Sequence, residues 1–186
     1  MQSEVHITTA APHRAVIVYV ALLLLSLGWL AVIFAAPMLM ANGHLLSAMV
    51  IYRSLSGICH QIPDRSFHLH GFPLAVCSRC TGIYIGFVIG LMLYPFVRSL
   101  RNQTMPSRNW LIAAGLPMLI DFGGGYLGLF KNTFVSRAAT GGLLGVAFSV
   151  YILTGMISIV EEWEAMRTGR NGGLHLPPGE CEKLRG

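Results

Sequence analysis

Charged residues are scarce in this chain of 186 residues. Asp, Glu, Lys and Arg make up 11% of the sequence, whereas hydrophobic residues make up 54%. Soluble domains contain about a quarter charged residues, so the composition excludes an ordinary water-soluble protein and predicts an integral membrane protein. The excess of Lys and Arg forms no basic face, so we expect no nucleic-acid partner. The sequence also has no nucleotide-binding glycine loop and no serine-nucleophile elbow, which argues against an ATP-driven machine.

Four apolar stretches are long enough to cross a membrane, because a hydrocarbon core of about 30 Å requires about 20 helical residues. The sequence therefore predicts an all-α, polytopic membrane protein, a bundle of about four transmembrane helices. We expect a polar lead at 1–14, a membrane domain at 15–160 and a flexible polar tail at 161–186. The first stretch exceeds a signal-peptide core, so we expect a retained helix. The expected spans are 15–41, 80–97, 110–130 and 134–160.

The segment between the first two spans, residues 42–79, is rich in Cys and His. Its first part, 44–58, mixes apolar and polar residues in a pattern that predicts an interfacial helix. The remainder contains Pro63, Gly71 and Pro73, so we expect irregular structure there. Eight Lys or Arg lie on the side of the termini and five on the other side. The positive-inside rule therefore predicts cytoplasmic termini and an extracytoplasmic Cys/His loop.

Glycines recur every four residues in two of the spans. Gly82, Gly86 and Gly90 lie in the second, and Gly141 and Gly145 lie in the fourth. This spacing lets helix backbones approach closely. We expect packing within the chain, with oligomerisation through the same glycine ridges as the alternative.

Three of the four cysteines are close in sequence. The two-residue gap between Cys77 and Cys80 lets a short turn present both sulfurs to one metal ion, and Cys59 with His60 would complete a four-ligand set. Zinc suits sulfur and nitrogen ligands of this kind. Adjacent residues such as Cys59 and His60 point in different directions on a regular backbone, so the alternative is that one of them does not bind the metal directly. In that case His68 or His70 is the alternative ligand.

The same cysteines are compatible with other chemistry. At the start of a helix the dipole lowers a thiol pKa, and Arg79 lies between Cys77 and Cys80, so a redox pair is one alternative. A disulfide from Cys59 to either of them is a second. Small buried hydrophobic residues are a third. Cys181, in the polar tail, is expected to be incidental.

Asp121 is the one acidic residue within the expected spans. Because an ionised carboxylate in hydrocarbon costs at least a few kcal/mol, it should face the bundle interior and have a partner. Pairing with Arg79 or Arg137 is one expectation, and a catalytic or ligand-binding role is the other. The neighbouring Pro117 and glycines 123–125 predict that the third helix is broken or loosened here.

Further polar residues are expected on the same side of the membrane as the Cys/His loop. Guanidinium groups form bidentate bonds to phosphate and carboxylate oxygens, so these residues could bind an anionic lipid headgroup. For any single arginine, topology or solvation is the alternative. The candidates for substrate binding are Arg65, Arg79, Asn132 and Arg137.

These motifs resemble the signature of a prokaryotic family of small predicted membrane proteins of unknown function. The resemblance covers roughly residues 46–145 and implies a multi-pass fold in a prokaryotic cytoplasmic membrane with a shared site, but no settled activity. A second glycine after Asp121 departs from the expected pattern. The matching residues are Cys59-His60-Gln61, Arg65-Ser66-Phe67, Cys77-Ser78-Arg79-Cys80-Thr81-Gly82, Pro117, Asp121, Asn132, Arg137, Thr140 and Gly141.

Together, these features favour a membrane-embedded metal-binding protein. The leading hypothesis is a metalloenzyme that acts on a lipid-like or isoprenoid substrate at one membrane face, with Asp121, Arg137 and His60 as catalytic candidates and membrane lipids as partners. One alternative is a thiol/disulfide redox protein linked to quinones. The other is a small lipid or ion transporter with a disulfide-stapled loop. The residues alone leave open whether the chain is an enzyme.

Overall fold

The chain is mainly helical in a computed structural model that describes residues 12–100, 105–129 and 131–171. One 3₁₀ turn and a two-stranded hairpin lie between the second and third helices. The elements in order are α1 (Pro12–Ala41), α2 (Leu45–Leu55), η1 (Pro63–Arg65), β1 (His68–Leu69), β2 (Phe72–Pro73), α3 (Ser78–Val97), α4 (Arg108–Tyr126) and α5 (Phe134–Asn171).

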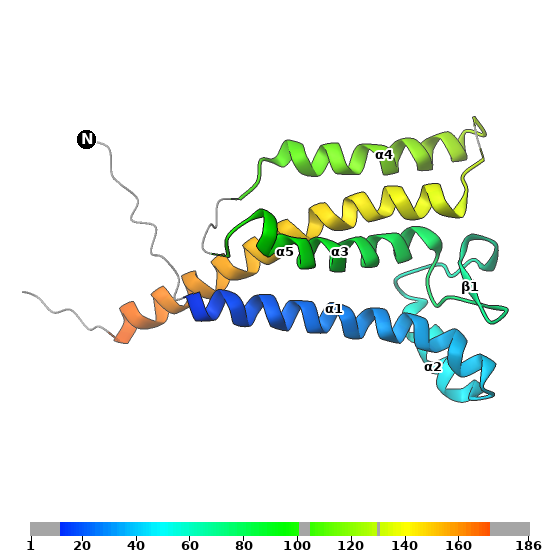
Figure 1. The fold of residues 1–186 in the computed structure, drawn as a ribbon, viewed down its shortest axis with the longest axis horizontal. Helices are drawn as coiled ribbons and strands as arrows, with labels where there is room; N and C mark the ends of the chain where they lie inside the picture. Colours follow the sequence, from blue (N-terminus) through cyan, green and yellow to red (C-terminus); the bar gives the residue numbers. More distant parts are fainter. Residues whose placement is uncertain (1–11, 101–104, 130, 172–186) are drawn as a thin grey trace, which may run out of the picture.

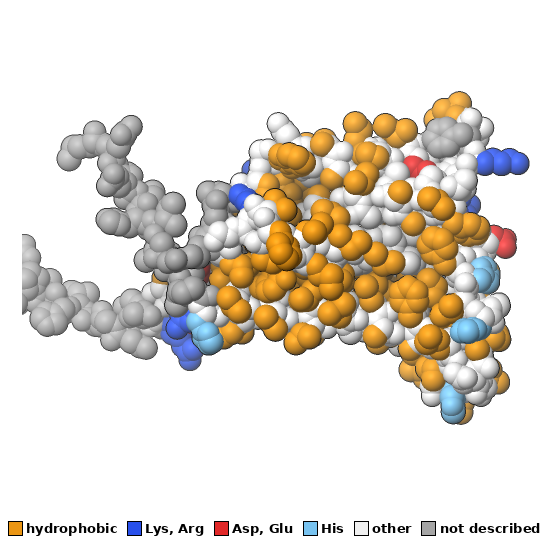
Figure 2. Space-filling view, in the orientation of Figure 1, with side chains coloured by type: hydrophobic (Ala, Val, Ile, Leu, Met, Phe, Trp, Pro, Cys, Tyr) orange, Lys and Arg blue, Asp and Glu red, His pale blue; other side chains and the backbone are white. Residues whose placement is uncertain are grey.

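Three of the described helices are long and apolar enough to cross a membrane. These segments are His13–Ala41, Ser78–Val97 and Phe134–Arg167. α4 does not meet the same standard of apolarity, but it runs beside α5 over much of the same length (Figure 1). Figure 2 shows a flank covered by apolar side chains, with Lys, Arg and His gathered towards the two ends. This distribution agrees with a helix bundle that spans a membrane.

The long helices are arranged so that the bundle has two different ends (Figure 1). At one end Arg14, at the start of α1, forms an ion pair with Glu164 of α5. At the other end lie α2, the hairpin and the turn between α4 and α5. We call this second end the polar end, because it holds the Cys/His segment and residues 131–137 together.

The glycine ridges hold α3 and α5 together. A side chain at Gly82 would overlap the backbone of Ala138, and one at Gly86 would overlap the backbone of Gly142. From the other side, a side chain at Gly145 would overlap the backbone of Ile83. The expectation of close packing within the chain is therefore confirmed for these glycines.

Two helices differ from the expectation, one in its continuity and one in its length. α4 continues as a helix through Pro117 and Gly123–Gly125 and ends at Tyr126, so the expected break at Asp121 is wrong. Proline is tolerated within a membrane helix where neighbours satisfy the freed backbone group. α5 continues to Asn171, beyond the expected end of the span at Val160. Cys181 lies outside the described residues.

The Cys/His loop is more ordered than its proline and glycine content predicts. An interfacial helix expected over 44–58 corresponds to α2, which packs against the end of α1. Beyond η1, β1 and β2 pair in antiparallel register, with His68 opposite Pro73. Positive φ angles at His70 and Gly71 form the tight connection between them, as two-residue hairpin turns require.

Candidate metal centre and membrane-face pocket

Three cysteine side chains converge at the start of α3. The sulfurs of Cys59, Cys77 and Cys80 all lie within 4.8 Å of one another. All three are free thiols, and no disulfide joins any two of them. Cys77 directly precedes α3, Cys80 lies in its first turn, and Cys59 follows α2. The fold thus brings together residues from two segments of the Cys/His loop.

Buried apolar contacts position both segments that carry the cysteines, and Cys59 itself belongs to the buried cluster. Residues 74–76, directly before Cys77, are at most 3% exposed. Ala75 and Val76 pack in one cluster with Ile33 of α1 and Leu55 of α2. Burial of these side chains favours one placement of the chain on each side of the sulfurs.

Gln61 joins the same two segments by hydrogen bonds. Its side-chain amide donates to the carbonyl oxygen of Tyr52 at 2.8 Å and to that of Ala75 at 2.9 Å. Gln61 itself has a φ of 50°, which is uncommon for a residue other than glycine. The Tyr52 hydroxyl donates to the carbonyl of Pro73 at 2.5 Å. These bonds fix the end of α2 against the segment that leads into α3.

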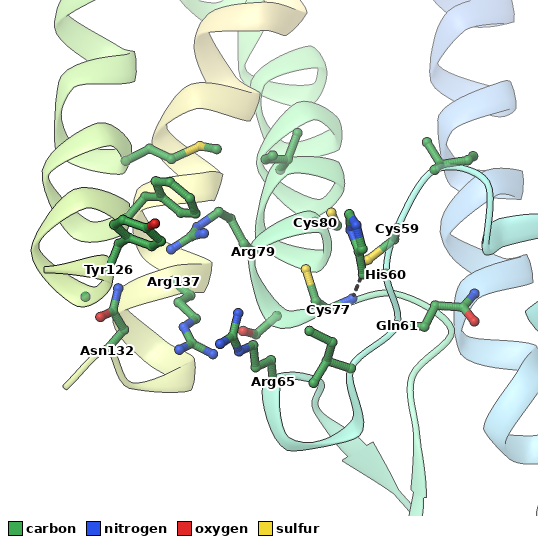
Figure 3. A pocket seen from close by; sticks show the side chains of 17 residues that line it. Cys59, His60, Gln61, Arg65, Cys77, Arg79, Cys80, Tyr126, Asn132 and Arg137 are labelled. Carbon is green, nitrogen blue, oxygen red and sulfur yellow. Dashed lines mark hydrogen bonds between the residues drawn. The ribbon is translucent and has the colours of Figure 1, made fainter. Parts of the chain in front are cut away.

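The environment favours a thiolate at Cys77. The backbone amide of Cys77 donates to the sulfur of Cys59 at 3.2 Å (Figure 3). The thiol of Cys80 donates to Cys77, and this bond, with further donors from the first turn of α3, lowers the pKa of Cys77 to about 5. A thiolate, not a thiol, is the form that binds metal.

The histidines are placed differently from the cysteines. His60 lines the same pocket as the three sulfurs, but its ring nitrogens are not part of the group that lies within 4.8 Å. His68 and His70 are exposed on the hairpin and lie outside that group too. Among the described residues the structure therefore assembles three sulfur ligands, without the expected nitrogen.

Asp121 has the buried ion-pair partner that the sequence suggested. A guanidinium nitrogen of Arg79 lies 2.6 Å from a carboxylate oxygen of Asp121, and the two side chains are only 17% and 7% exposed. The side-chain amide of Asn132 donates to the backbone carbonyl of Asp121. Arg79 also lies over the ring of Phe122, 5.5 Å from its centre. This network links α3, α4 and the turn before α5.

A pocket of about 470 Å³ contains nearly all of these groups. Figure 3 shows the cysteines on one side, with Arg65 and Arg137 below them and Tyr126 and Asn132 opposite. Asp121 is not among the lining residues, but its ion-pair partner Arg79 is. The lining includes Cys59, His60, Arg65, Cys77, Arg79, Cys80, Asn132 and Arg137. The fold thus brings the candidate residues from four separate segments to one cavity.

Sequence reasoning missed several residues of the site. Gln61 belongs to the Cys-His-Gln motif but was given no role, because its two backbone acceptors are distant in sequence. Ser78 is fully buried in the pocket wall, and its hydroxyl has no hydrogen-bond partner among the described residues. Phe122 and Tyr126 also line the pocket. Their spacing of four residues on one helix face was the available signal.

Known proteins share this part of the chain. A family profile described as "Predicted membrane protein (DUF2085)" matches residues 59–151. An uncharacterised protein of Methanocaldococcus jannaschii is 39% identical over 106 residues, which cover 57% of this chain and 68% of that protein. An uncharacterised protein of Methanothermobacter thermautotrophicus is 33% identical over 93 residues, 50% of this chain and 82% of that protein. No solved structure matches.

Proposed function

We propose a function for this chain, which belongs to the family of predicted membrane proteins DUF2085. The protein binds zinc through Cys59, Cys77 and Cys80. We further propose that it is a metalloenzyme which acts on a lipid-like or isoprenoid substrate at one membrane face. The observation that carries this proposal is the convergence of three free sulfurs on a pocket at the polar end of the bundle.

The donor set fits a zinc ion. Tetrahedral zinc with bonds of about 2.3 Å to sulfur holds its sulfurs about 3.8 Å apart. The three sulfurs already lie within 4.8 Å of one another, so small side-chain movements suffice. The amide of Cys77 that donates to the sulfur of Cys59 is the kind of outer hydrogen bond that orients and stabilises a metal ligand.

Three protein ligands favour a catalytic site over a closed structural one. Catalytic zinc keeps one position open, and there it polarises a substrate oxygen or activates a water molecule. His60 and Arg137 line the pocket that the cysteines face. In this proposal His60 transfers a proton, and Arg137 stabilises negative charge that develops on a substrate oxygen. Asp121 acts on this site through Arg79.

Elemental analysis of the purified full-length protein tests the metal. We expect about one zinc ion per chain in the wild type, loss of zinc in Cys77→Ser and retention in His60→Ala. Equal loss in His60→Ala would indicate a closed structural site with His60 as fourth ligand. Wild-type protein that contains no stoichiometric metal after purification without chelators would refute the proposal.

Activity is tested on lipids directly. Wild-type protein and Cys77→Ser are reconstituted in vesicles that contain phospholipid and a polyprenyl phosphate, and the lipids are followed by mass spectrometry. We expect a product only with the zinc-loaded wild type. A metal-bound protein that converts neither lipid class would restrict the cysteines to a structural role.

A redox function is the second candidate, because Cys77 and Cys80 are free thiols at the start of α3 and their sulfurs lie within 4.8 Å of each other. Oxidation of this pair to a disulfide releases two electrons and two protons, which would reduce a quinone to its quinol. Thiol trapping separates the two functions. A redox pair becomes inaccessible to alkylation on oxidation and recovers with reductant, whereas zinc-bound thiolates become accessible when a chelator is added.

A further inference from the structure

Two arginines lie at the border between two pockets of the polar end. Beside the Cys-lined pocket is a second pocket of about 570 Å³, lined by residues from 62–65 and 132–137. None of the three cysteines lines this outer pocket. Four residues line both pockets, and two of them are cationic. These four are Ile62, Arg65, Asn132 and Arg137.

The two arginines have no counter-ion within the described part of the chain. The ion pairs of Arg14 with Glu164 and of Arg79 with Asp121 include neither Arg65 nor Arg137. Asp64 lines the outer pocket but forms no ion pair with its neighbour Arg65. Two guanidinium groups that face one cavity repel each other unless an anion lies between them. They are also the groups best suited to bind phosphate with paired hydrogen bonds.

Arg79 is not available for the same task. Its guanidinium is held by the carboxylate of Asp121 and by the ring of Phe122. The arginines that line the pocket without an ion-pair partner among the described residues are therefore Arg65 and Arg137. Figure 3 shows both on the same side of the pocket. Arg79 is a positioning residue, and these two arginines form the anion site.

Both pockets have mixed lining: His60, Gln61 and Ser78 line the inner pocket as well as apolar side chains, and Phe134 lines the outer one. Ile83 of α3 and Met118 and Phe122 of α4 line the inner pocket. Met118 lies two turns from the end of α4, so the apolar wall reaches about 12 Å along the helix from the polar end. Asp64 and Thr133 line the outer pocket. A ligand that fills both pockets can place an apolar chain beside Met118 and Phe122 and a polar group beside Asp64 and Thr133.

We infer that the paired pockets bind a phospholipid-like amphiphile whose phosphate lies between Arg65 and Arg137. Its apolar chain follows Met118 and Phe122, and its polar headgroup occupies the outer pocket. The cysteine centre then lies on the chain side of the phosphate. This ligand is the substrate only if the proposed function holds, whereas its binding can be measured on protein that contains no metal.

Binding of a short-chain lipid tests the assignment. The full-length protein in detergent is titrated with dioctanoyl phosphatidylglycerol and, separately, with dioctanoylglycerol and inorganic phosphate, and binding is measured by native mass spectrometry and calorimetry. We expect the phosphate-bearing lipid to bind most tightly. Arg65→Gln and Arg137→Gln should each weaken it about tenfold or more, since each removes charge-assisted bonds to one phosphate. Arg108→Gln, an exposed arginine that lines neither pocket, should bind as the wild type.

A second variant separates a lipid site from a site for a free ion. Met118→Trp fills the apolar wall, so it should weaken the lipid and leave the affinity for inorganic phosphate unchanged. Each variant is compared with the wild type by size-exclusion profile and melting temperature. Lipid binding is then interpreted for the variants that retain both. Unchanged lipid affinity in both arginine variants would overturn the inference. Inorganic phosphate that binds as tightly as the lipid would overturn it too.

The two proposals fail separately. Cys77→Ser should lose zinc and keep the lipid. Wild-type protein that binds lipid through the arginines but contains no zinc would refute the proposed function alone. Protein that contains zinc but binds lipid equally well without Arg65 and Arg137 would refute this inference alone.

Discussion

Arg79 and Asp121 form a hydrogen-bonded ion pair of 2.6 Å between the first turn of α3 and the interior of α4. Arg79 lies between Cys77 and Cys80 in sequence, so this pair ties the cysteine centre to α4. α4 packs mainly against α5. The ion pair therefore provides a polar link across the pocket, and the side-chain amide of Asn132 donates a hydrogen bond to the backbone carbonyl of Asp121.

Loss of the Asp121 charge should destabilise the fold. In Asp121→Asn, Arg79 remains buried without a counter-charge, which costs about 3 kcal/mol in comparable buried pairs. Thermal unfolding in detergent measures the change. The matched control is Glu164→Gln, which breaks the more exposed pair with Arg14 and should cost at most about 1 kcal/mol. Replacement of both residues, as in Arg79→Met with Asp121→Leu, should cost less than Asp121→Asn alone, and the opposite order would contradict the structure.

Glycine substitutions should separate packed from free positions. Gly86→Ala places a methyl group onto the backbone of Gly142, which forces α3 and α5 apart at a cost of about 1–3 kcal/mol. Gly28→Ala on α1 meets no atom within 4 Å and should be neutral or stabilising by up to about 1 kcal/mol. Melting temperatures of the two variants check this. Similar melting temperatures would show that the α3–α5 contact is looser than described.

Alkylation of metal-free protein should follow the lowered pKa of Cys77. Because the pKa in the folded protein is about 5, the thiolate persists as the pH falls from 8 to 6 and is lost only near pH 5. The rate of iodoacetamide labelling at Cys77, followed by peptide mass spectrometry, should therefore stay level to about pH 6 and then fall. In Cys80→Ala the midpoint should rise towards the ordinary thiol value of about 8.5, because the main donor is gone. A midpoint that does not change would assign the effect to the backbone amides.

Gln61 should control metal affinity without contact to the metal. Gln61→Ala removes the two bonds that hold the carbonyls of Tyr52 and Ala75 together, so Cys59 is less well positioned. Loss of such outer-shell support lowers metal affinity about 10- to 100-fold. Competition with a chromogenic zinc chelator measures it. His68→Ala, in the exposed hairpin, is the control and should retain wild-type affinity. Equal loss of zinc affinity in both variants would show that the hydrogen bonds of Gln61 have no specific effect on the metal site.

Local patterns in the sequence predicted much of this molecule. Apolar length predicted the membrane-spanning helices, and the four-residue glycine spacing predicted the α3–α5 contact. The cost of a lone carboxylate predicted a partner for Asp121. The break expected in α4 was wrong, because a local count of proline and glycine does not register the packing of α4 on α5 or the hold of Asn132 and Arg79 on Asp121.

The sequence by itself determined that the chain lies in a membrane, that it is helical, and that three of its cysteines lie close together in sequence. These properties follow from solvation and from backbone periodicity, which act on neighbouring residues. Only the tertiary structure decided that Cys59 joins Cys77 and Cys80 without His60, that Arg79 rather than Arg137 pairs with Asp121, and that Arg65 and Arg137 border two pockets. Such choices depend on packing between distant segments, and sequence spacing does not encode those distances.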